Sequence, residues 1–216
     1  MVPNSSAPHI RSKPLGLALV AVALFPGCLA DTAGPPSGEN QSVVVSETGL
    51  RVWLDAVPGA GYGHPSTITP GMLRPLLEDI WFEETGPSRS GRRRVFDAYE
   101  VGRLEDGLAA ALVRANSDER IGFRIESEKG KDPGPAERLT SGFLFVRGSR
   151  MHFIFGNVNA PTQGARAAVF DGDPMRSPPA SGWRIIPQGK QTLGPGGSVF
   201  DTQPHWLVIE IGQLQP

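Results

Sequence analysis

Histidines and a pair of aspartates are the residues of this chain whose types could hold a metal ion or move a proton. Beyond the N-terminal segment there are three histidines, His64, His152 and His205, and Asp171 and Asp173 stand two residues apart. No histidine belongs to a zinc-binding motif, so a metal site would need these distant side chains to converge on one ion. We therefore predict no metal site and no cofactor, and we expect His152 and His205 to be structural residues in strands.

Two short loops share features with ligand-binding motifs without completing them. Gly59–His64 (GAGYGH) lacks the third glycine of a dinucleotide loop, because His64 stands there, and no Gly-Lys-Ser/Thr follows it. Phe170–Pro174 (FDGDP) lacks the third acid and the distant glutamate of a calcium loop. We interpret the first as a flexible surface loop and the second as a tight turn closed by aspartate side chains.

Nucleophilic catalysis has no local signature in this sequence. There is no Gly-x-Ser-x-Gly motif, and the chain contains a single cysteine, Cys28. Ser-His-Asp groups can assemble from distant positions, so a hydrolase that uses His64 or His152 with a nearby carboxylate stays an alternative. We assign no catalytic residue and favour a protein that is not an enzyme.

Cys28 stands at the end of a segment built like an export signal. Arg11 and Lys13 precede an apolar run, residues 15–25, which is followed by Pro26-Gly27-Cys28. Eleven residues would span only about half of a ~30 Å hydrocarbon core, so this run is too short for a transmembrane helix. The segment Leu24–Cys28 resembles the lipobox of bacterial prolipoproteins as a class, although Phe25 and Pro26 depart from its commonest form.

That resemblance implies that residues 1–27 are a signal peptide and that Cys28 is lipidated, with diacylglycerol on its sulfur. The protein would then be anchored in the cell envelope by its lipid. Leu29, where some Gram-negative lipoproteins carry an aspartate for inner-membrane retention, favours the outer membrane. In the alternative, Cys28-Leu29-Ala30 is cut after Ala30 by ordinary signal peptidase, which leaves a soluble secreted or periplasmic protein.

The charge balance excludes one class of partner. Removing residues 1–27 takes two of the 21 lysines and arginines and no acid, which leaves 19 basic against 22 acidic residues, a net charge of −3. We therefore expect no nucleic-acid binding. The basic segment Arg89–Arg94 is predicted to be a solvated loop, with contact to anionic lipid or an acidic partner as the alternative.

The domain organisation follows from composition. Residues 28–41 are small and polar and include Pro35-Pro36, so we predict a flexible tether after the lipidated cysteine. Residues 42–216 are predicted to form a single α+β domain. Its expected strands are Val43–Val45, Leu50–Val57, Arg120–Glu126, Ser141–Val146, Arg150–Phe155, Trp183–Ile186 and Trp206–Ile211, with irregular chain over Asn157–Gly182 and Pro187–Gln203.

Two helices are expected between the second and third strands. Apolar residues at three- and four-residue spacing predict a helix from about Pro75 to Glu84, after a short first turn at Thr69-Pro70. Asp97 and Glu100 form a capping-box pattern that begins a second helix, Ala98–Asn116. We predict a mostly antiparallel sheet with the two helices packed on one face, and Leu104, Leu108 and Leu112 against the sheet.

The function predicted from these observations is that of a lipid-anchored envelope protein which binds a protein partner or helps an assembly without catalysis. Aromatic strands with free edges suit strand addition by such a partner. The alternatives are the hydrolase named above and a small-ligand-binding protein with its pocket at the mouth of the glycine-rich loops.

Overall fold

The computed structural model describes residues 41–85, 91–129, 136–163, 169–176, 179, 182–194 and 203–212. The predicted signal peptide, the predicted lipidation site Cys28 and the predicted tether up to residue 40 lie outside the described residues. So do residues 89 and 90 of the predicted basic loop. Within the described residues, no helix is both long and apolar enough to cross a membrane.

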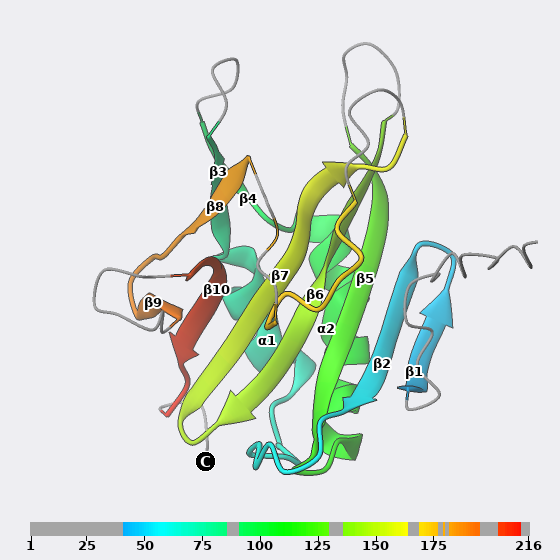
Figure 1. Ribbon diagram of the computed structural model, residues 1–216, viewed down its shortest axis with the longest axis vertical. Helices are drawn as coiled ribbons and strands as arrows, with labels where there is room; N and C mark the ends of the chain where they lie inside the picture. The colour runs from blue at the N-terminus through cyan, green and yellow to red at the C-terminus, as the bar shows by residue number, and fades with distance from the viewer. Residues whose placement is uncertain are drawn as a thin grey trace, which may run out of the picture. The chain divides into compact units, whose positions relative to one another are not determined.

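The described strands form two antiparallel sheets (Figure 1). The large sheet has seven strands in the order β1-β2-β5-β6-β7-β10-β9, and the small one has the order β4-β3-β8. The strands of the large sheet are β1 (Gln41–Glu47), β2 (Leu50–Ala56), β5 (Glu119–Lys129), β6 (Ala136–Arg147), β7 (Arg150–Pro161), β9 (Gln191–Gly194) and β10 (Gln203–Glu210). Those of the small sheet are β3 (Trp81–Glu84), β4 (Arg92–Arg94) and β8 (Trp183–Ile186). The predicted class, α+β with a mostly antiparallel sheet and two helices, is confirmed.

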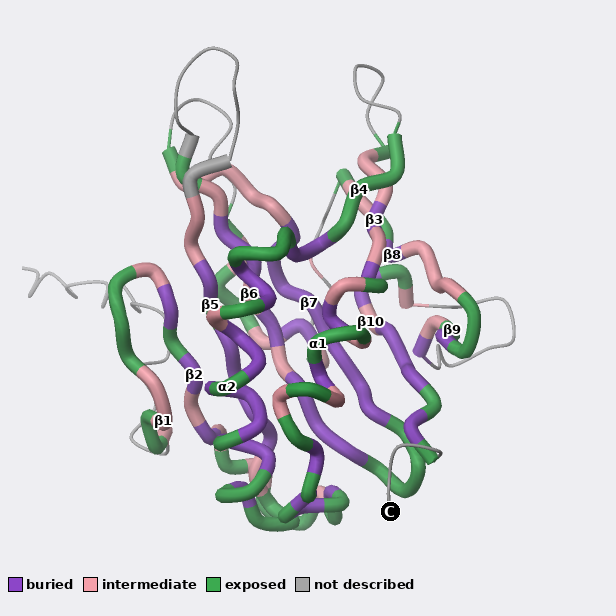
Figure 2. Tube along the Cα trace, turned by 180° about the vertical axis from the view of Figure 1, so that it is seen from behind, coloured by how far each residue is buried: buried purple, intermediate pink, exposed green. Residues whose placement is uncertain are grey.

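Helix α2 (Ala98–Arg114) begins as predicted. The Asp97 side chain accepts a hydrogen bond from the Glu100 amide at 2.9 Å, and the Glu100 carboxylate accepts one from the Asp97 amide at 2.8 Å. This reciprocal pair satisfies two of the amide groups that a helix start leaves free. The helix packs against β1, β2 and β5, and buried residues run along the chain beneath it (Figure 2).

Leu108 is the test residue for this packing. Its side chain is 0% exposed and lies in one apolar cluster with the core residues of β5, which are Ile121, Phe123 and Ile125. We expect Leu108→Ala to lower the free energy of unfolding by about 2–5 kcal/mol, because the truncation leaves a cavity that a packed core cannot close. Chemical denaturation measures this, and Val113→Ala on the exposed side of α2 is the matched control.

The first helix differs from the prediction. Helix α1 (Pro70–Glu78) contains Pro75 in its interior and ends at Asp79, so the expected helix up to Glu84 is wrong. Proline costs the helix one hydrogen bond, but its fixed φ is compatible with a helical turn. The next residues, Trp81–Glu84, form β3 because they pair with β8 and β4. Helix α1 packs on α2, and the Arg74 guanidinium joins the Glu105 carboxylate across the two.

Three segments predicted as loops are ordered by pairing. Arg92–Arg94 forms β4 against β3, and Gln191–Gly194 forms β9 against β10 inside the span expected to be irregular. Strand β7 continues to Pro161, past the predicted end at Phe155, because β6 extends beside it. Each of these segments pairs with the strand that precedes or follows it in the chain, and the composition of the segment alone does not show that pairing.

The glycine-rich loop also departs from its prediction. In residues 61–69 every second side chain is buried, namely Tyr62, His64, Ser66 and Ile68. The loop backbone is held by hydrogen bonds from the Gly59 amide to Asp118 at 3.0 Å and from the Tyr62 amide to the Ser117 carbonyl at 2.8 Å. The segment is thus an irregular loop with exposed glycines, as predicted, but Tyr62 and His64 are buried, so it packs against the domain.

Candidate interaction site

The three histidines contact apolar and backbone groups. His152 stacks on Phe145 with ring centroids 4.7 Å apart, and its Nδ1 accepts a hydrogen bond from the Trp206 indole at 3.1 Å. Nε2 of His205 lies 3.0 Å from the carbonyl oxygen of Pro174. His64 is 8% exposed, with its ring edge-on to Tyr62 at 6.1 Å. These contacts give each histidine a packing role.

Burial sets the protonation state of these rings. Desolvation lowers the pKa of His64 to about 4, and desolvation together with Arg147 and Arg150 lowers the pKa of His152 to about 4. Burial also lowers the pKa of His205. All three rings are therefore neutral at pH 7. In the part of the chain that the structure describes, no group of three or more His, Cys, Asp or Glu side chains is placed to hold a metal ion.

The two depressed histidine pKa values predict acid sensitivity. An unfolded histidine binds its proton near pH 6.5, whereas folded His64 and His152 bind it only near pH 4. Between these values the unfolded chain holds more protons, so the free energy of unfolding falls as pH drops from 6.5 to 4, by on the order of 3 kcal/mol for each histidine.

Urea denaturation at each pH measures this slope. The His64→Leu variant should show a visibly shallower decline over the same window, because one of the two linked protons is removed. An identical slope in wild type and variant would contradict the burial of a neutral His64.

The acidic loop is joined to the sheet by an arginine. The Asp173 carboxylate accepts hydrogen bonds from both terminal nitrogens of Arg120, at 3.0 and 2.9 Å, and Asp55 accepts one from Nε at 2.7 Å. Asp173 also accepts a hydrogen bond from the Met175 amide at 3.0 Å. This bond closes the turn that was predicted at the aspartates. Asp171 is exposed and takes no part in these bonds. The sequence analysis did not identify Arg120, which lies 53 residues from Asp173.

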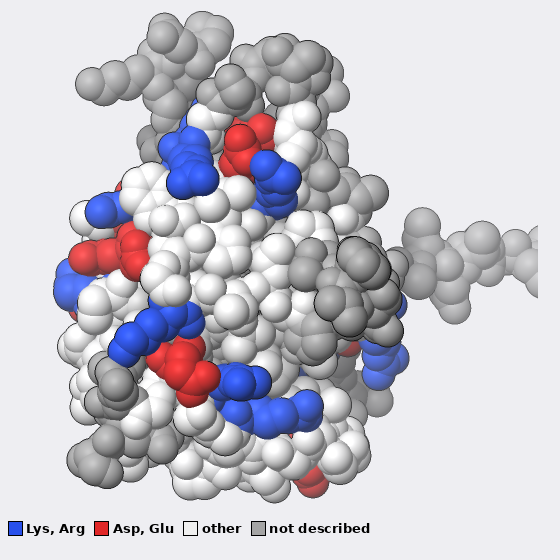
Figure 3. Space-filling view, turned by 90° about the vertical axis from the view of Figure 1, so that its left-hand side faces the viewer, with Lys and Arg blue, Asp and Glu red and all other residues white. Residues whose placement is uncertain are grey.

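The arginine run is interleaved with acids and aromatic rings. Arg93 pairs with Glu84 at 3.6 Å, and the Arg94 guanidinium lies 5.5 Å from the Trp81 ring. On the far strand of the small sheet Arg184 pairs with Glu83 at 2.8 Å. Figure 3, which shows the side of the molecule with β3, β8 and β9, has acidic and basic side chains next to each other. This surface therefore carries mixed charge rather than one basic patch.

The opposite border of the large sheet is an edge strand. Among the described residues, β1 is hydrogen-bonded to β2 alone, so its second side presents backbone N–H and C=O groups without a strand beside them (Figure 1). Val43 in the middle of β1 is 44% exposed, and Val44 and Val45 pack partly against the core. An exposed edge of this kind is a template for pairing with another chain.

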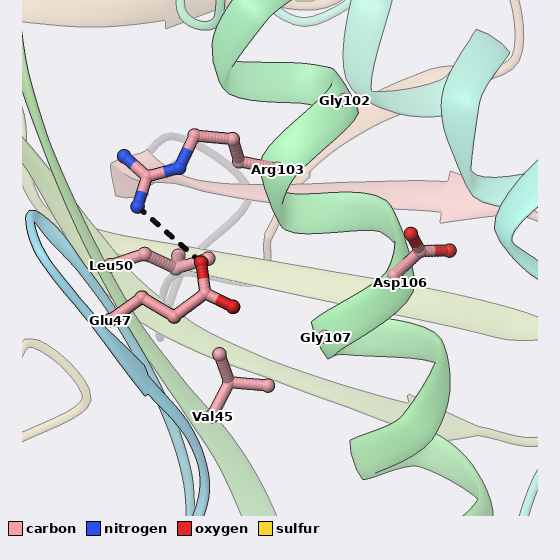
Figure 4. A pocket seen from close by; sticks show the side chains of 7 residues that line it. All are labelled: Val45, Glu47, Leu50, Gly102, Arg103, Asp106 and Gly107. Atoms are coloured by element: carbon pink, nitrogen blue, oxygen red, sulfur yellow. Dashed lines mark ion pairs between the residues drawn. The ribbon is translucent and has the colours of Figure 1, made fainter.

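A groove lies directly beside this edge. It has a volume of about 350 Å³ between the β1–β2 hairpin and α2, and Figure 4 shows its walls. Val45 and Leu50 supply an apolar side, and Gly102 and Gly107 lie on the helix side of the groove. A Cβ on Gly107 would lie 3.2 Å from the side chains of Val45 and Val52, a tight contact that would require these valines to shift by a few tenths of an ångström, whereas a Cβ on Gly102 would meet nothing within 4 Å.

Charged groups hold the rim of the groove. Arg103 donates a hydrogen bond to the Thr48 carbonyl at 2.6 Å and pairs with Glu47 at 3.8 Å, which ties α2 to the turn of the hairpin. Asp106 stands one helical turn further along the groove (Figure 4). On either side of these residues along α2, Tyr99 in the first turn is 67% exposed and Val113 in the last turn is 58% exposed. Edge, groove and helix surface together form the candidate interaction site.

Comparisons with known proteins give no further assignment for this site. Searches of family models, of curated proteins and of solved structures each found no match to this chain.

Proposed function

We propose that this chain is a lipid-anchored envelope protein that binds a protein partner without catalysis. In this proposal the signal peptide, residues 1–27, is removed and lipid on Cys28 holds the protein at the membrane, with the outer membrane favoured. The two helices cover one face of the large sheet, and the free edge β1 receives an extended segment of the partner. The observation that carries the proposal is the edge strand with a groove of mixed apolar and charged lining beside it.

Strand addition would use two parts of the candidate interaction site, the edge and the groove. The free N–H and C=O groups of β1 supply affinity through main-chain hydrogen bonds, and a neighbouring groove supplies specificity for side chains. β1 begins at Gln41, directly after the predicted tether, so the edge is the part of the domain closest in sequence to the lipid. A partner in the same envelope could therefore bind β1 without contacting the rest of the domain.

The contacts of the histidines favour this function over the alternative hydrolase. A general base has to stand within hydrogen-bond reach of a nucleophile or a substrate proton. His152 instead accepts from the Trp206 indole, and His205 faces the Pro174 carbonyl. The hydrogen bonds of Asp173 go to Arg120 and to the Met175 amide, so this carboxylate does not orient a histidine.

The groove also supports a second candidate, a small-ligand-binding protein. Its volume of about 350 Å³ lies within the range of ligand pockets, roughly 300–1,000 Å³. The lining combines apolar Val45 and Leu50 with the charges of Arg103 and Asp106. This pocket differs from the one predicted at the glycine-rich loops, since none of its lining residues comes from Gly59–His64.

Site-specific photocrosslinking in intact envelopes tests the proposed partner binding. A photoreactive residue at Val43 should capture a protein on irradiation, because this exposed side chain lies on the proposed contact edge. The matched control is the same residue at Val169, which is exposed at 39% outside the candidate interaction site. Adducts of equal yield at both positions, or at neither, would contradict binding through β1.

A further inference from the structure

The β1 edge lacks most of the devices by which proteins protect a sheet edge. Its sequence, Gln-Ser-Val-Val-Val-Ser-Glu, contains no lysine, no arginine and no proline, and its only charge is Glu47 at the end. Exposed edges usually carry charges or proline along the strand, which prevent pairing with another chain. The one irregularity is a bulge at Val44, where β1 has a residue more than β2. The strand is thus open to a neighbour along its length.

Pairing with β2 shows which face each β1 side chain takes, because opposite residues in an antiparallel pair share a face. Ser42, Val45 and Glu47 stand opposite Leu54, Val52 and Leu50, so they belong to the face that carries the core. Val43 and Ser46 stand opposite Trp53 and Arg51, on the other face. The bulge separates the two halves, with Val44 and Val45 both packed partly against the core.

We propose that the occupant of this edge is a second copy of the same chain, paired β1 to β1 in antiparallel orientation about a two-fold axis perpendicular to the sheet. The proposal rests on the proposed function and names its partner. The register that keeps like faces together sets Val43 opposite Ser46 of the second copy, Ser42 opposite Glu47, and Val44 opposite Val45. The two large sheets then join into one.

Charge favours a second copy in this register. Antiparallel pairing places the two Glu47 side chains at opposite ends of the new ladder, five residues apart along it, or roughly 17 Å at about 3.4 Å per residue. That separation exceeds the screening length of about 8 Å at physiological salt, so their repulsion is small. Each Glu47 instead meets the hydroxyl of Ser42, which can donate to it. A two-fold interface has to be self-complementary in this way.

The proposed anchor favours the same geometry. A two-fold axis along the membrane normal brings residue 41 of both copies to the same height above the bilayer. The 14 tether residues, 28–41, reach at most roughly 45 Å at about 3.3 Å each, so both lipids can enter one membrane. Attachment to that membrane raises the effective concentration of one edge near another and adds to the pairing that the two strands form by themselves.

Paired cysteines test the register. In the full chain with Cys28→Ser, Val43→Cys and Ser46→Cys should oxidise to a disulfide-linked dimer, because opposite residues of an antiparallel pair have Cα atoms about 4.5–5.5 Å apart. The two cysteines of one copy are three residues apart along a strand, about 10 Å, and cannot bridge each other. The control pair, Val43→Cys with Glu47→Cys, lies on opposite faces and should stay reduced. Equal cross-linking of both pairs would overturn the register.

A charge-swap pair tests the association itself. Sedimentation equilibrium of the full chain with Cys28→Ser in detergent should give about twice the 23.1 kDa protein mass. Adding Val43→Lys and Ser46→Lys places like charges opposite each other and should return the mass to that of the monomer. Val43→Lys with Ser46→Glu places opposite charges there and should keep the dimer. Both positions are exposed, so neither change disturbs the core.

The outcomes separate this inference from the proposed function. A dimer of the parent chain with Cys28→Ser and a dimer of its variant with Val43→Lys and Ser46→Glu support self-pairing. A monomeric parent chain, while the Val43 photocrosslink captures a different envelope protein, overturns self-pairing and leaves partner binding standing. A monomeric parent chain with no crosslink at Val43 overturns both.

Discussion

Cys28→Ser is expected to abolish the lipid anchor of the protein. The serine hydroxyl cannot be acylated in place of the thiol, so the precursor should accumulate uncut or the protein should be released in soluble form. Wild-type protein should partition into detergent and resist washing with salt, because each buried CH₂ of an acyl chain contributes about 0.8 kcal/mol and several chains make anchoring effectively permanent. Phase partitioning and immunoblotting of envelopes measure the change.

A second variant separates lipid from electrostatic attachment. Replacing Arg92, Arg93 and Arg94 by glutamine removes the positive charge of the exposed strand β4 and leaves Cys28 intact. This variant should still partition into detergent, because screening by salt removes charge attraction but not acyl insertion. Mass spectrometry of the mature N-terminus is decisive. A chain that begins at Asp31 without lipid would disprove the lipoprotein proposal and favour the soluble secreted protein.

Local signals explain which elements could be predicted from the sequence. A capping box at Asp97 and Glu100 and leucines at four-residue spacing, all within one short segment, predict helix α2. The β6–β7 hairpin turns at Gly148, whose φ of +58° suits glycine, between two apolar runs. These elements are determined by neighbours in the chain, and the helix and the hairpin are confirmed, although α2 ends at Arg114 rather than Asn116 and both strands of the hairpin are longer than predicted.

Elements made by distant pairing could not be predicted in the same way. Phe82 of β3 stands opposite Ile185 of β8, about a hundred residues away, and the four residues Trp81–Glu84 contain no clear alternation. Their apolar residues also fit the period of the preceding helix, which is why a helix was expected there. The glycine-rich loop had a usable signal, the alternation of buried and exposed residues from Tyr62 to Ile68, which its glycines and prolines obscured.

The candidate interaction site was only partly accessible from the sequence. A strand at Val43–Val45 was predicted, but its place at the border of the large sheet depends on the order of all seven strands. The groove depends on how closely α2 approaches the hairpin, and the relevant residue, Gly107, stands among apolar helix residues without a motif of its own. Edge and groove are properties of the assembled fold, so spacing along the chain does not predict them.

Arg120→Met is expected to lower the free energy of unfolding by about 3–5 kcal/mol. Arg120 is largely buried, its guanidinium lies 3.6 Å from the ring centroid of Phe143, and it joins Asp55 and Asp173. Removing it leaves two partly buried carboxylates without their counter-ion, which is the costly way to break such a group. For a domain of this size the midpoint of thermal unfolding should fall by roughly 6–20 °C, at about 2–4 °C per kcal/mol.

The pH dependence identifies the cause. Burial acts to raise the pKa of Asp173, but the hydrogen bonds and charge of Arg120 outweigh it and hold the pKa below its ordinary value. In wild type, the stability from this carboxylate is present above about pH 3.8, the unfolded value, and is lost as pH falls through the lower folded value. In Arg120→Met the largest influence that lowers this pKa is lost, and only the Met175 amide and Arg176 still oppose burial, so the pKa of Asp173 rises relative to wild type. Acidification then protonates Asp173 at a higher pH in the variant and should narrow the difference in the free energy of unfolding between variant and wild type.

The chain offers a matched control on the same strand. Arg124 lies four residues along β5 and pairs with Glu126 at 2.6 Å, but both side chains are well exposed. Exposed ion pairs contribute about 0–1 kcal/mol, so Arg124→Met should change stability little. Adding Asp55→Asn and Asp173→Asn to Arg120→Met removes the stranded charges and should recover part of the loss. If Arg120→Met costs no more than Arg124→Met at pH 7, the arginine does not hold the acidic loop at Asp173 to the sheet, because removing a buried counter-ion should destabilise the fold more than removing an exposed one.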